Sequence, residues 1–511
     1  MGRRQRALLV RTILFLFALN AFSFVLYFLL NPRPNTPTPL LQTLETLTTA
    51  PPPPPRSSSS LKPWPSLPSF LPWRPSPPLP VRSCEAYFGH GFSRRVDVFA
   101  RRGAGGGWFR CRHSETLSSS ICEGGSLRMD PTRILMSEGG ERLDKVIGRG
   151  EEDELPKYEP GAFRIERGEG GDATAPADGR LVDEAFLDLY MPRGAIQMHT
   201  MRALVESVRV VGPGELECSQ WIDEPTLLVT RFEYANLFHT VTDWYNAYVS
   251  SRVADLPGRP NLVFIDGHCK APLEETWEAL FSSVRYAKNF SGPVCFRHAI
   301  LSPLGYETAL FKGLTESFSC QGASADTLRQ NPNYQKTARL SEFGEMLLAA
   351  FGLLENRELP MKKISKVHNV LFIRREDYLA HPRHSGKIES RLSNEQEVFD
   401  ATKNWAKDQK KCRINVVNGL FAHMHMKEQL LAVREASVVI GAHGAGLTHL
   451  VVATLDTIVL EIISSMYRRP HFSLISQWKG LEYHAINLAG SYARPDEVVA
   501  ELSRIMGSLG C

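Results

Sequence analysis

A glycine-rich loop toward the C-terminus contains the residue types best suited to bind a ligand. The stretch 441–449 reads GAHGAGLTH and directly follows the apolar segment 437–440. Glycines let a backbone approach a ligand closely, and the unpaired N–H groups at the start of a helix favour a diphosphate. The pattern therefore predicts a phosphate-binding turn between a strand and a helix, with its candidate residues at Gly441, His443, Gly444, Ala445 and Gly446.

An acid and two arginines complete the predicted phosphate site. Glu461 ends the next apolar segment, about 20 residues after the loop begins, where a carboxylate can hold ribose hydroxyls. Arg374 and Arg375 end the segment 369–375, and arginine suits bidentate contact with phosphate. The alternatives are a surface glutamate after a tight turn, and salt bridges from the arginines to neighbouring acids.

A second group of residues could move a proton. His239 and Asp243 are four residues apart in the predicted helix 236–252 and so lie on one face of it. Asp243 could orient His239 as a general base or act as the base itself, and Glu233 is a third candidate. The sequence leaves the choice among these three open, and helix capping or packing is the alternative for the pair.

The elements that must position these residues alternate between strands and helices. Strands are predicted at 227–231, 261–267, 369–375, 413–418, 437–440, 457–463 and 483–488. Helices are predicted at 236–252, 273–284, 341–351, 395–407, 426–435, 447–452 and 495–509. Short apolar strands that alternate with helices indicate parallel sheets covered on both faces. We expect an α/β fold with two Rossmann-like domains facing a cleft, at 81–352 and 353–511.

The N-terminus predicts a membrane anchor. Residues 1–11 contain four arginines and no acid, and the apolar run 12–30 is long enough to cross a hydrocarbon core. Its length argues against a cleavable signal peptide. Residues 31–80 are rich in proline and serine and are predicted to form a disordered stem. A polar stretch, 148–180, is predicted to be an exposed loop.

Charge and cysteine usage narrow the class of protein. Outside the N-terminal tail the chain balances 55 basic against 55 acidic residues, which argues against a nucleic-acid partner. All nine cysteines follow the anchor, so some should form disulfides and at least one should be free or intermolecular. No cysteine or histidine cluster has zinc spacing. Asn289 begins a single glycosylation sequon.

Four long stretches of the chain resemble one family. They are 225–252, 295–314, 370–384 and 436–449, and they are similar to plant N-glycan β-1,2-xylosyltransferases within glycosyltransferase family 61. The broader family is similar at the segment N-x-F-H-x-x-x-D, here spanning Asn236, His239 and Asp243, at the arginine after the middle strand, and at the HGAG loop with its later glutamate. No DxD triplet is present, so the metal site of the other main transferase architecture is not supported.

The resemblance implies an inverting, Golgi-located enzyme of GT-B-like fold. Stabilising the departing diphosphate fits Arg374 or Arg375 and the amides of the glycine loop, so no metal ion is expected to be needed. The resemblance also implies UDP-xylose as donor and the core β-mannose of an N-glycan as acceptor, with Asn236 and Trp244 on the acceptor side. Trp244 and Trp221 could stack on sugars, and core packing is the alternative for each. Three rival functions remain: a family 61 pentosyltransferase acting on xylan, a membrane-tethered glycan-binding protein without turnover, and a dehydrogenase. The loop spacing GxxGxG, rather than GxGxxG, argues against the last of these.

Overall fold

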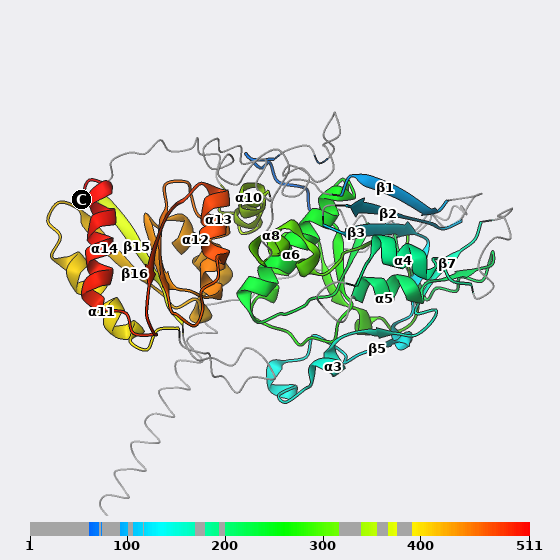
Figure 1. Cartoon of the computed structure of the whole chain (residues 1–511). Helices are drawn as coiled ribbons and strands as arrows, with labels where there is room; N and C mark the ends of the chain where they lie inside the picture. Colours follow the sequence, from blue (N-terminus) through cyan, green and yellow to red (C-terminus); the bar gives the residue numbers. More distant parts are fainter. Residues whose placement is uncertain are drawn as a thin grey trace, which may run out of the picture. The chain divides into compact units, whose positions relative to one another are not determined.

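A computed structural model describes residues 61–70, 73, 92–100, 106–115, 117–168, 179–193, 200–315, 339–354, 366–375 and 391–511 (Figure 1). The predicted cytoplasmic tail, the anchor 12–30 and most of the stem lie outside these ranges. None of the helices in the described ranges is long and apolar enough to span a bilayer. Residues 60–511 form one compact unit.

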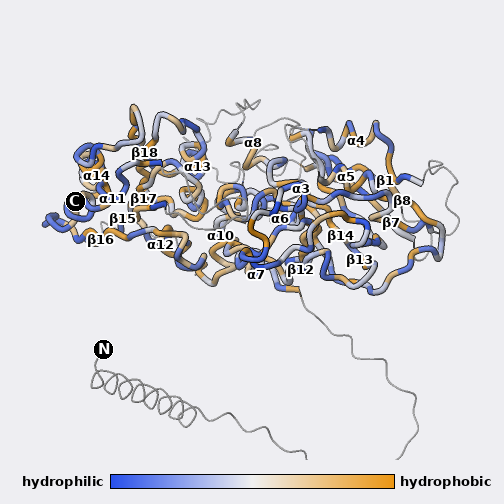
Figure 2. Tube along the Cα trace, turned by 90° about the horizontal axis from the view of Figure 1, so that it is seen from below, coloured by the Kyte–Doolittle hydropathy of each residue, from blue (hydrophilic) through white to orange (hydrophobic). Residues whose placement is uncertain are grey.

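The C-terminal sheet has five parallel strands in the order β16-β15-β17-β18-β19. Figure 2 shows β16, β15, β17 and β18 following one another across the sheet. The strands are β15 (Val367–Ile373), β16 (Arg413–Gly419), β17 (Val438–Ala442), β18 (Ile458–Ile463) and β19 (Glu482–Asn487). The sheet confirms the parallel α/β arrangement predicted for this half of the chain.

Helices cover both faces of this sheet because successive strand residues point to opposite sides. Val370 and Phe372 pack with α11 (Glu395–Lys407) and α14 (Pro495–Ser508), whereas Leu371 and Ile373 face the side of α12 (Met426–Arg434) and α13 (His471–Lys479). Figure 1 shows α11 and α14 on one side of β15 and β16, with α12 and α13 on the other. The sequence pattern did not predict α13.

The N-terminal part of the body is built around a seven-stranded sheet in the order β1-β2-β3-β14-β10-β11-β12. Strands β14, β10, β11 and β12 are parallel, whereas β1, β2 and β3 pair antiparallel. The bounds are β1 (Arg94–Phe99), β2 (Trp108–Ser114), β3 (Ser119–Gly125), β10 (Thr226–Val229), β11 (Asn261–Phe264), β12 (Val284–Tyr286) and β14 (Ala299–Leu301). The prediction of a second wholly parallel sheet is therefore wrong, because a tight β2–β3 connection needs no crossover helix.

A second sheet packs against one face of the seven-stranded sheet. Its order is β8-β7-β4-β13-β9, and its residues share a core with α5 (Thr200–Ser207) and with alternate residues of β10 and β11. The strands are β4 (Leu127–Met129), β7 (Phe163–Glu166), β8 (Arg209–Val211), β9 (Gln220–Ile222) and β13 (Val294–Phe296). The prediction of an exposed loop at 148–180 is wrong in part, because the Phe163 and Ile165 side chains of β7 are fully buried in this core.

The opposite face of the seven-stranded sheet is covered by α6 (Leu237–Val253) and α7 (Glu274–Leu280). Nearly every residue of α6 is buried, as expected for a helix enclosed on all sides. It contacts the 3-10 helix η7 (Ala445–Val452) of the C-terminal sheet, as does α10 (Leu340–Ala350). The predicted helix 273–284 is too long, since α7 ends at Leu280 and β12 begins at Val284, and the helix predicted at 447–452 is this 3-10 helix.

Part of the predicted stem belongs to the folded body. Residues 61–70 and Trp73, hereafter the strap, pack on α6 and α10, and the Leu67 and Trp73 side chains are each 6% exposed. The Arg252 guanidinium lies 3.7 Å from the Trp64 ring centroid, and Ser69 donates from both its backbone N–H and its hydroxyl to Glu345. The disorder predicted to residue 80 is therefore wrong here, because these aromatic side chains bury enough apolar surface to order the segment.

Three disulfides stabilise the described residues. They join Cys111 to Cys122, Cys218 to Cys295, and Cys412 to Cys511, while Cys269 is free and buried. The expectation that some cysteines pair and at least one does not is confirmed.

Candidate functional site

The glycine loop lies where the chain order in the C-terminal sheet reverses. From β15 the chain crosses to β16 on one side and then returns to β17 on the other, so β15 and β17 flank a topological switch point. Ligands of open parallel sheets bind at the carboxyl ends of strands at such a point. Arg375 follows β15 and Gly444 follows β17, so the structure brings these two predicted residues together at that edge.

Contact with Arg375 requires glycine at position 444. A Cβ at Gly444 would lie within 3.0 Å of the Arg375 guanidinium, and one at Gly446 would collide in the same way with the Ile373 side chain. A Cβ at Gly441 would lie 3.3 Å from the Ile373 side chain, which is a tight contact rather than a collision. The glycines therefore let the loop lie flat against the end of β15, while Ala445 begins η7 with its N–H free of any intrahelical acceptor.

Arg374 and Arg375 point in different directions. Arg374 donates to the Gln396 side chain at 2.7 Å and pairs with Glu395 at 3.4 Å, both on α11. Its guanidinium lies 4.9 Å from the Phe399 ring centroid. Arg375 is thus the arginine beside the glycine loop, and Arg374 belongs to the packing of α11.

His443 and Glu461 form a buried pair beneath the loop. His443 Nδ1 lies 2.5 Å from Glu461 Oε1, and the Tyr483 hydroxyl donates to Glu461 Oε2 at 2.6 Å. Glu461 is 1% exposed. The structure places Glu461 next to the loop as predicted, but both of its oxygens have protein partners, so it positions His443, and its contact with a ribose stays a prediction.

His239 lies at the start of α6 among aromatic rings. Its Nδ1 is 2.8 Å from the Tyr306 hydroxyl, and the rings of Phe232 and Phe238 have centroids 5.6 Å and 5.3 Å from that of His239. Burial lowers the pKa of His239; the nearby Glu233 opposes this effect and Arg469 adds to it. A half-buried neutral imidazole of this kind can accept a proton.

The predicted partner of His239, Asp243, contacts other groups. The backbone N–H of Gly305 donates to Asp243 Oδ1 and that of Phe232 to Oδ2, each at 3.0 Å. Asp243 is 2% exposed, and burial raises its pKa to about 8. The buried Asp243 carboxyl group therefore links two backbone segments through hydrogen bonds. Asp243 lies on the His239 side of α6, as predicted.

The other candidates in this region have local roles. Glu233 Oε1 accepts from the backbone N–H groups of Tyr234 and Ala235. The Asn236 side chain caps α6 by accepting from the N–H of Phe238. Trp244 is 1% exposed in the core, so the packing alternative holds for it. Trp221 is 39% exposed, with Arg297 stacked 3.8 Å from its ring centroid.

The first residue of α13 connects the two groups of candidates. The His471 ring stacks on Phe238 with centroids 4.9 Å apart and planes 4° apart, and its centroid lies 6.2 Å from that of His443. Burial, reinforced by His443, Arg469 and His239, lowers the pKa of His471 to about 4. The proton-accepting and phosphate-binding candidates are thus neighbours within one compact unit. The sequence did offer one indication of α13: two neighbouring parallel strands, β18 and β19, need a crossover connection between them, which is usually a helix.

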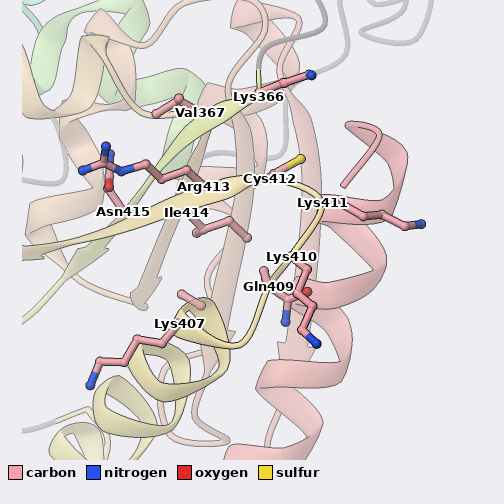
Figure 3. A pocket seen from close by; sticks show the side chains of 11 residues that line it. Lys366, Val367, Lys407, Gln409, Lys410, Lys411, Cys412, Arg413, Ile414 and Asn415 are labelled. Carbon is pink, nitrogen blue, oxygen red and sulfur yellow. The ribbon is translucent and has the colours of Figure 1, made fainter.

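The hollow in Figure 3 lies elsewhere. It is at the other end of β15 and β16 and is lined by five cations, Lys366, Lys407, Lys410, Lys411 and Arg413. Their side chains point away from one another rather than toward a common centre (Figure 3). Nearby, His368, Cys412 and Cys511 bring three potential metal ligands within 4.8 Å, but the two sulfurs are joined in a disulfide and are not thiolates. Neither feature extends the candidate site.

Asn289 is exposed at the end of a short 3-10 helix, Ala287–Asn289, in an accessible position for modification. Its glycosylation stays a prediction.

Comparison with known proteins assigns the family. The β-1,2-xylosyltransferase RCN11 of Oryza sativa subsp. japonica is 66% identical over 522 residues, covering 99% of this chain and 96% of its own length. The β-1,2-xylosyltransferase of Arabidopsis thaliana is 58% identical, covering 88% of this chain and 90% of its own. The pattern of Glycosyltransferase 61 matches residues 223–460. The chain belongs to glycosyltransferase family 61.

More distant likenesses cover less of the chain. The EGF domain-specific O-linked N-acetylglucosamine transferase of Gallus gallus is 24% identical over 280 residues, covering 52% of this chain and 45% of its own. A solved diflavin flavoprotein A3 from Nostoc sp. covers 29% of this chain and 93% of its own at 16% identity, with a TM-score of 0.19. The family 61 match includes His239, Tyr306, Arg375 and the glycine loop, whereas His471 lies beyond it.

Proposed function

We propose that this family 61 member is an inverting xylosyltransferase that moves xylose from UDP-xylose in β-1,2 linkage onto the core β-mannose of N-linked glycans. The observation that carries the proposal is full-length similarity to two proteins named β-1,2-xylosyltransferase. The geometry of the site supports it, since a neutral imidazole and an arginine-flanked glycine loop are the two parts that a single displacement needs.

In the proposed reaction the acceptor hydroxyl oxygen attacks the anomeric carbon while His239 Nε2 takes its proton. The bond between that carbon and the diphosphate oxygen breaks, and UDP leaves with the electron pair. Arg375 and the N–H groups at the start of η7 face the developing negative charge, so the chain's own groups perform the role that a metal ion has in other transferases.

The finer assignments rest on the sequence. We propose a GT-B-like arrangement of the two sheet-centred parts, and a Golgi location as a single-pass type II protein anchored by residues 12–30, with its catalytic body in the lumen. The basic tail before that segment supports this orientation. N-glycans on glycoproteins and the membrane are the partners proposed.

The test is a transfer assay with the full-length chain in detergent. UDP-xylose, UDP-glucose and UDP-N-acetylglucosamine are each offered with a GlcNAc-terminated N-glycan or with xylan, and products are measured by mass spectrometry. A gain of one pentose on the N-glycan alone is expected. Transfer to xylan alone would identify a different acceptor, and glycan binding without UDP release would indicate a non-catalytic binding protein.

Matched arginine variants test the donor site. Arg375→Ala is expected to weaken UDP binding about tenfold or more, because it removes a charged contact, as measured by titration calorimetry. Arg374→Ala should leave UDP affinity within about threefold, since its contacts are with α11. Equal effects of the two variants would place the diphosphate away from the glycine loop.

A further inference from the structure

The hydrogen-bond partner of His239 comes from outside its own helix. Tyr306 lies on the 3-10 helix η4 (Gly305–Glu307), 67 positions further along the chain, and its hydroxyl is 2.8 Å from His239 Nδ1. Tyr306 is buried, with its ring packed against Phe232 at 4.1 Å and Phe311 at 3.8 Å between centroids. The phenol is therefore held in place by aromatic packing, independently of the hydrogen bond.

The direction of this hydrogen bond determines what His239 can do. A neutral imidazole carries one proton, so a hydrogen on Nδ1 that is donated to the phenol oxygen leaves Nε2 with its lone pair. The opposite direction would put the hydrogen on Nε2 and prevent it from accepting another. A base acting through Nε2 thus needs the Tyr306 oxygen as an acceptor.

Asp243 fixes the two segments that surround this pair. Its oxygens accept from the N–H of Gly305, next to Tyr306, and from the N–H of Phe232, whose ring packs on both Tyr306 and His239. A Cβ at Gly305 would lie within 3.0 Å of Asp243 Oδ1, so the backbone is as close to the carboxyl group as glycine allows. With both oxygens used and the side chain 2% exposed, Asp243 is not placed to reach a substrate hydroxyl.

We infer that Tyr306 is the positioning residue that keeps His239 Nε2 free to take the acceptor proton, and that Asp243 acts through Tyr306 and Phe232 rather than on the proton itself. The inference rests on the proposed function, because it assigns roles within that reaction. The proton passes from the acceptor hydroxyl to Nε2, Nδ1–H stays donated to the phenol, and the imidazolium later releases the proton to water. Burial raises the pKa of Tyr306, which keeps the phenol neutral throughout.

Other titratable groups also face His239. Glu233 comes from the segment before α6, and Arg469 and His471 come from the segment that leads into α13 and from its first residue. The Tyr306 hydroxyl is hydrogen-bonded to His239 Nδ1 at 2.8 Å, and this contact fixes the direction of the ring.

The experiment compares Tyr306→Phe with Tyr190→Phe in the full-length chain. Tyr190 is the last residue of α4 (Glu184–Tyr190), and it is a matched control because its hydroxyl accepts one 3.5 Å hydrogen bond from Arg94 of β1, away from η4 and α6. Tyr306→Phe keeps the ring and removes the acceptor, so kcat for xylose transfer should fall about 10- to 100-fold. UDP affinity, donor KM and the thermal midpoint should change little, and Tyr190→Phe should behave as wild type.

A double-mutant cycle separates positioning from a merely structural role. If Tyr306 acts through His239, Tyr306→Phe should cost nothing further in a His239→Ala background. An unchanged or raised kcat for Tyr306→Phe, while the wild type transfers xylose normally, would overturn the inference and leave the proposed function intact. A wild type that transfers no pentose to any acceptor would overturn the function instead.

The variant Asp243→Asn tests independently whether Asp243 has a structural role or acts as the base. The amide has one oxygen for two N–H donors, so both the thermal midpoint and kcat should fall together. Complete loss of transfer with an unchanged midpoint, combined with a fully active Tyr306→Phe, would identify Asp243 as the base and contradict the inference.

Discussion

At the scale of single residues, the proposed donor site depends most on the closeness of Gly444 to Arg375. The Gly444 backbone is extended, with φ of 174°, so another residue could adopt its conformation, and only the contact with the Arg375 guanidinium requires glycine. Because arginine is a flexible side chain, an added methyl should displace it rather than unfold the loop. The consequence of substitution is then expected in ligand affinity rather than in stability.

We predict that Gly444→Ala weakens UDP binding about tenfold, with a change in unfolding free energy below about 1 kcal/mol. Gly490→Ala is the control, since a Cβ there meets nothing within 4 Å. Calorimetric titration with UDP and thermal unfolding of both variants provide the measurements. Wild-type affinity in Gly444→Ala would show that Arg375 does not contact the diphosphate.

The pKa of His239 gives a second residue-scale prediction. A base must be unprotonated to act, and burial lowers the pKa of His239 below 6.5, so kcat should persist to a lower pH than an exposed histidine would allow. The Arg469 charge contributes to this lowering. Arg469→Gln should therefore raise the pKa and move the acid limb of the kcat–pH profile toward neutral pH.

Arg468→Gln is the matched control for this profile, because the Arg468 side chain contacts the Leu488 carbonyl at 3.5 Å instead. The neighbours Glu233, Tyr306 and His471 are unchanged in both variants. An acid limb that moves equally in the two variants, or that moves to lower pH in Arg469→Gln, would contradict the assignment of His239 as the base.

The sequence predicted the residues that form contiguous motifs and missed those that do not. The glycine loop and His239 each lie in one short stretch, so they could be chosen as candidates without a fold. Tyr306 is 67 positions from His239 and His471 is 28 positions from His443, and only the packing of α6, η4 and α13 brings these side chains together.

At the scale of elements, the contact between α10 and η7 joins the two sheet-centred parts of the body. Gly344 is inside α10, and a Cβ there would lie within 3.0 Å of the Val451 carbonyl oxygen. Leu340, Phe343 and Leu347 pack into the same core as Leu450. Because the backbone of α10 lies directly against the backbone of η7 at this point, no flexible side chain can move aside. Position 344 therefore cannot accept a residue larger than glycine without strain.

We predict that Gly344→Ala lowers the free energy of unfolding by about 1–3 kcal/mol, although alanine normally stabilises a helix interior by about 1 kcal/mol over glycine. Gly507→Ala in α14 should show that normal gain, because a Cβ there meets nothing within 4 Å. Urea unfolding of both variants measures the difference. A stabilised Gly344→Ala would mean that α10 does not lie against η7 in solution.

Element prediction succeeded where strands were continuous apolar runs. β15, β17 and β18 are almost wholly buried and were recognised, whereas β2 alternates half-buried and buried residues and was not. α13 was missed because its polar residues, among them His471, Ser476 and Lys479, are buried by tertiary packing that the sequence pattern does not reveal.

At the scale of the whole molecule, the strap decides where the folded body begins. Composition predicted a stem to residue 80, because proline and serine dominate that region, but Trp64 and Trp73 within it pack on the body. Trp73 packs edge-on against Tyr248 at 6.2 Å between centroids and donates from Nε1 to Glu342. Tyr248 also donates to Glu342, and the Arg339 guanidinium lies over the Trp73 ring and pairs with the same carboxylate.

Removing the Trp73 ring would therefore open a cavity and expose a buried ionic network at the same time. We predict that Trp73→Ala lowers the free energy of unfolding by about 3–5 kcal/mol. Trp221→Ala removes an indole that is 39% exposed and should cost about 1 kcal/mol or less. Because α10 carries Glu342 and also contacts η7, loss of the strap should weaken UDP binding as well as stability. Thermal unfolding with and without UDP measures both effects. Equal midpoints for the two tryptophan variants would mean that the strap does not pack on the body and belongs to a disordered stem, as composition predicted.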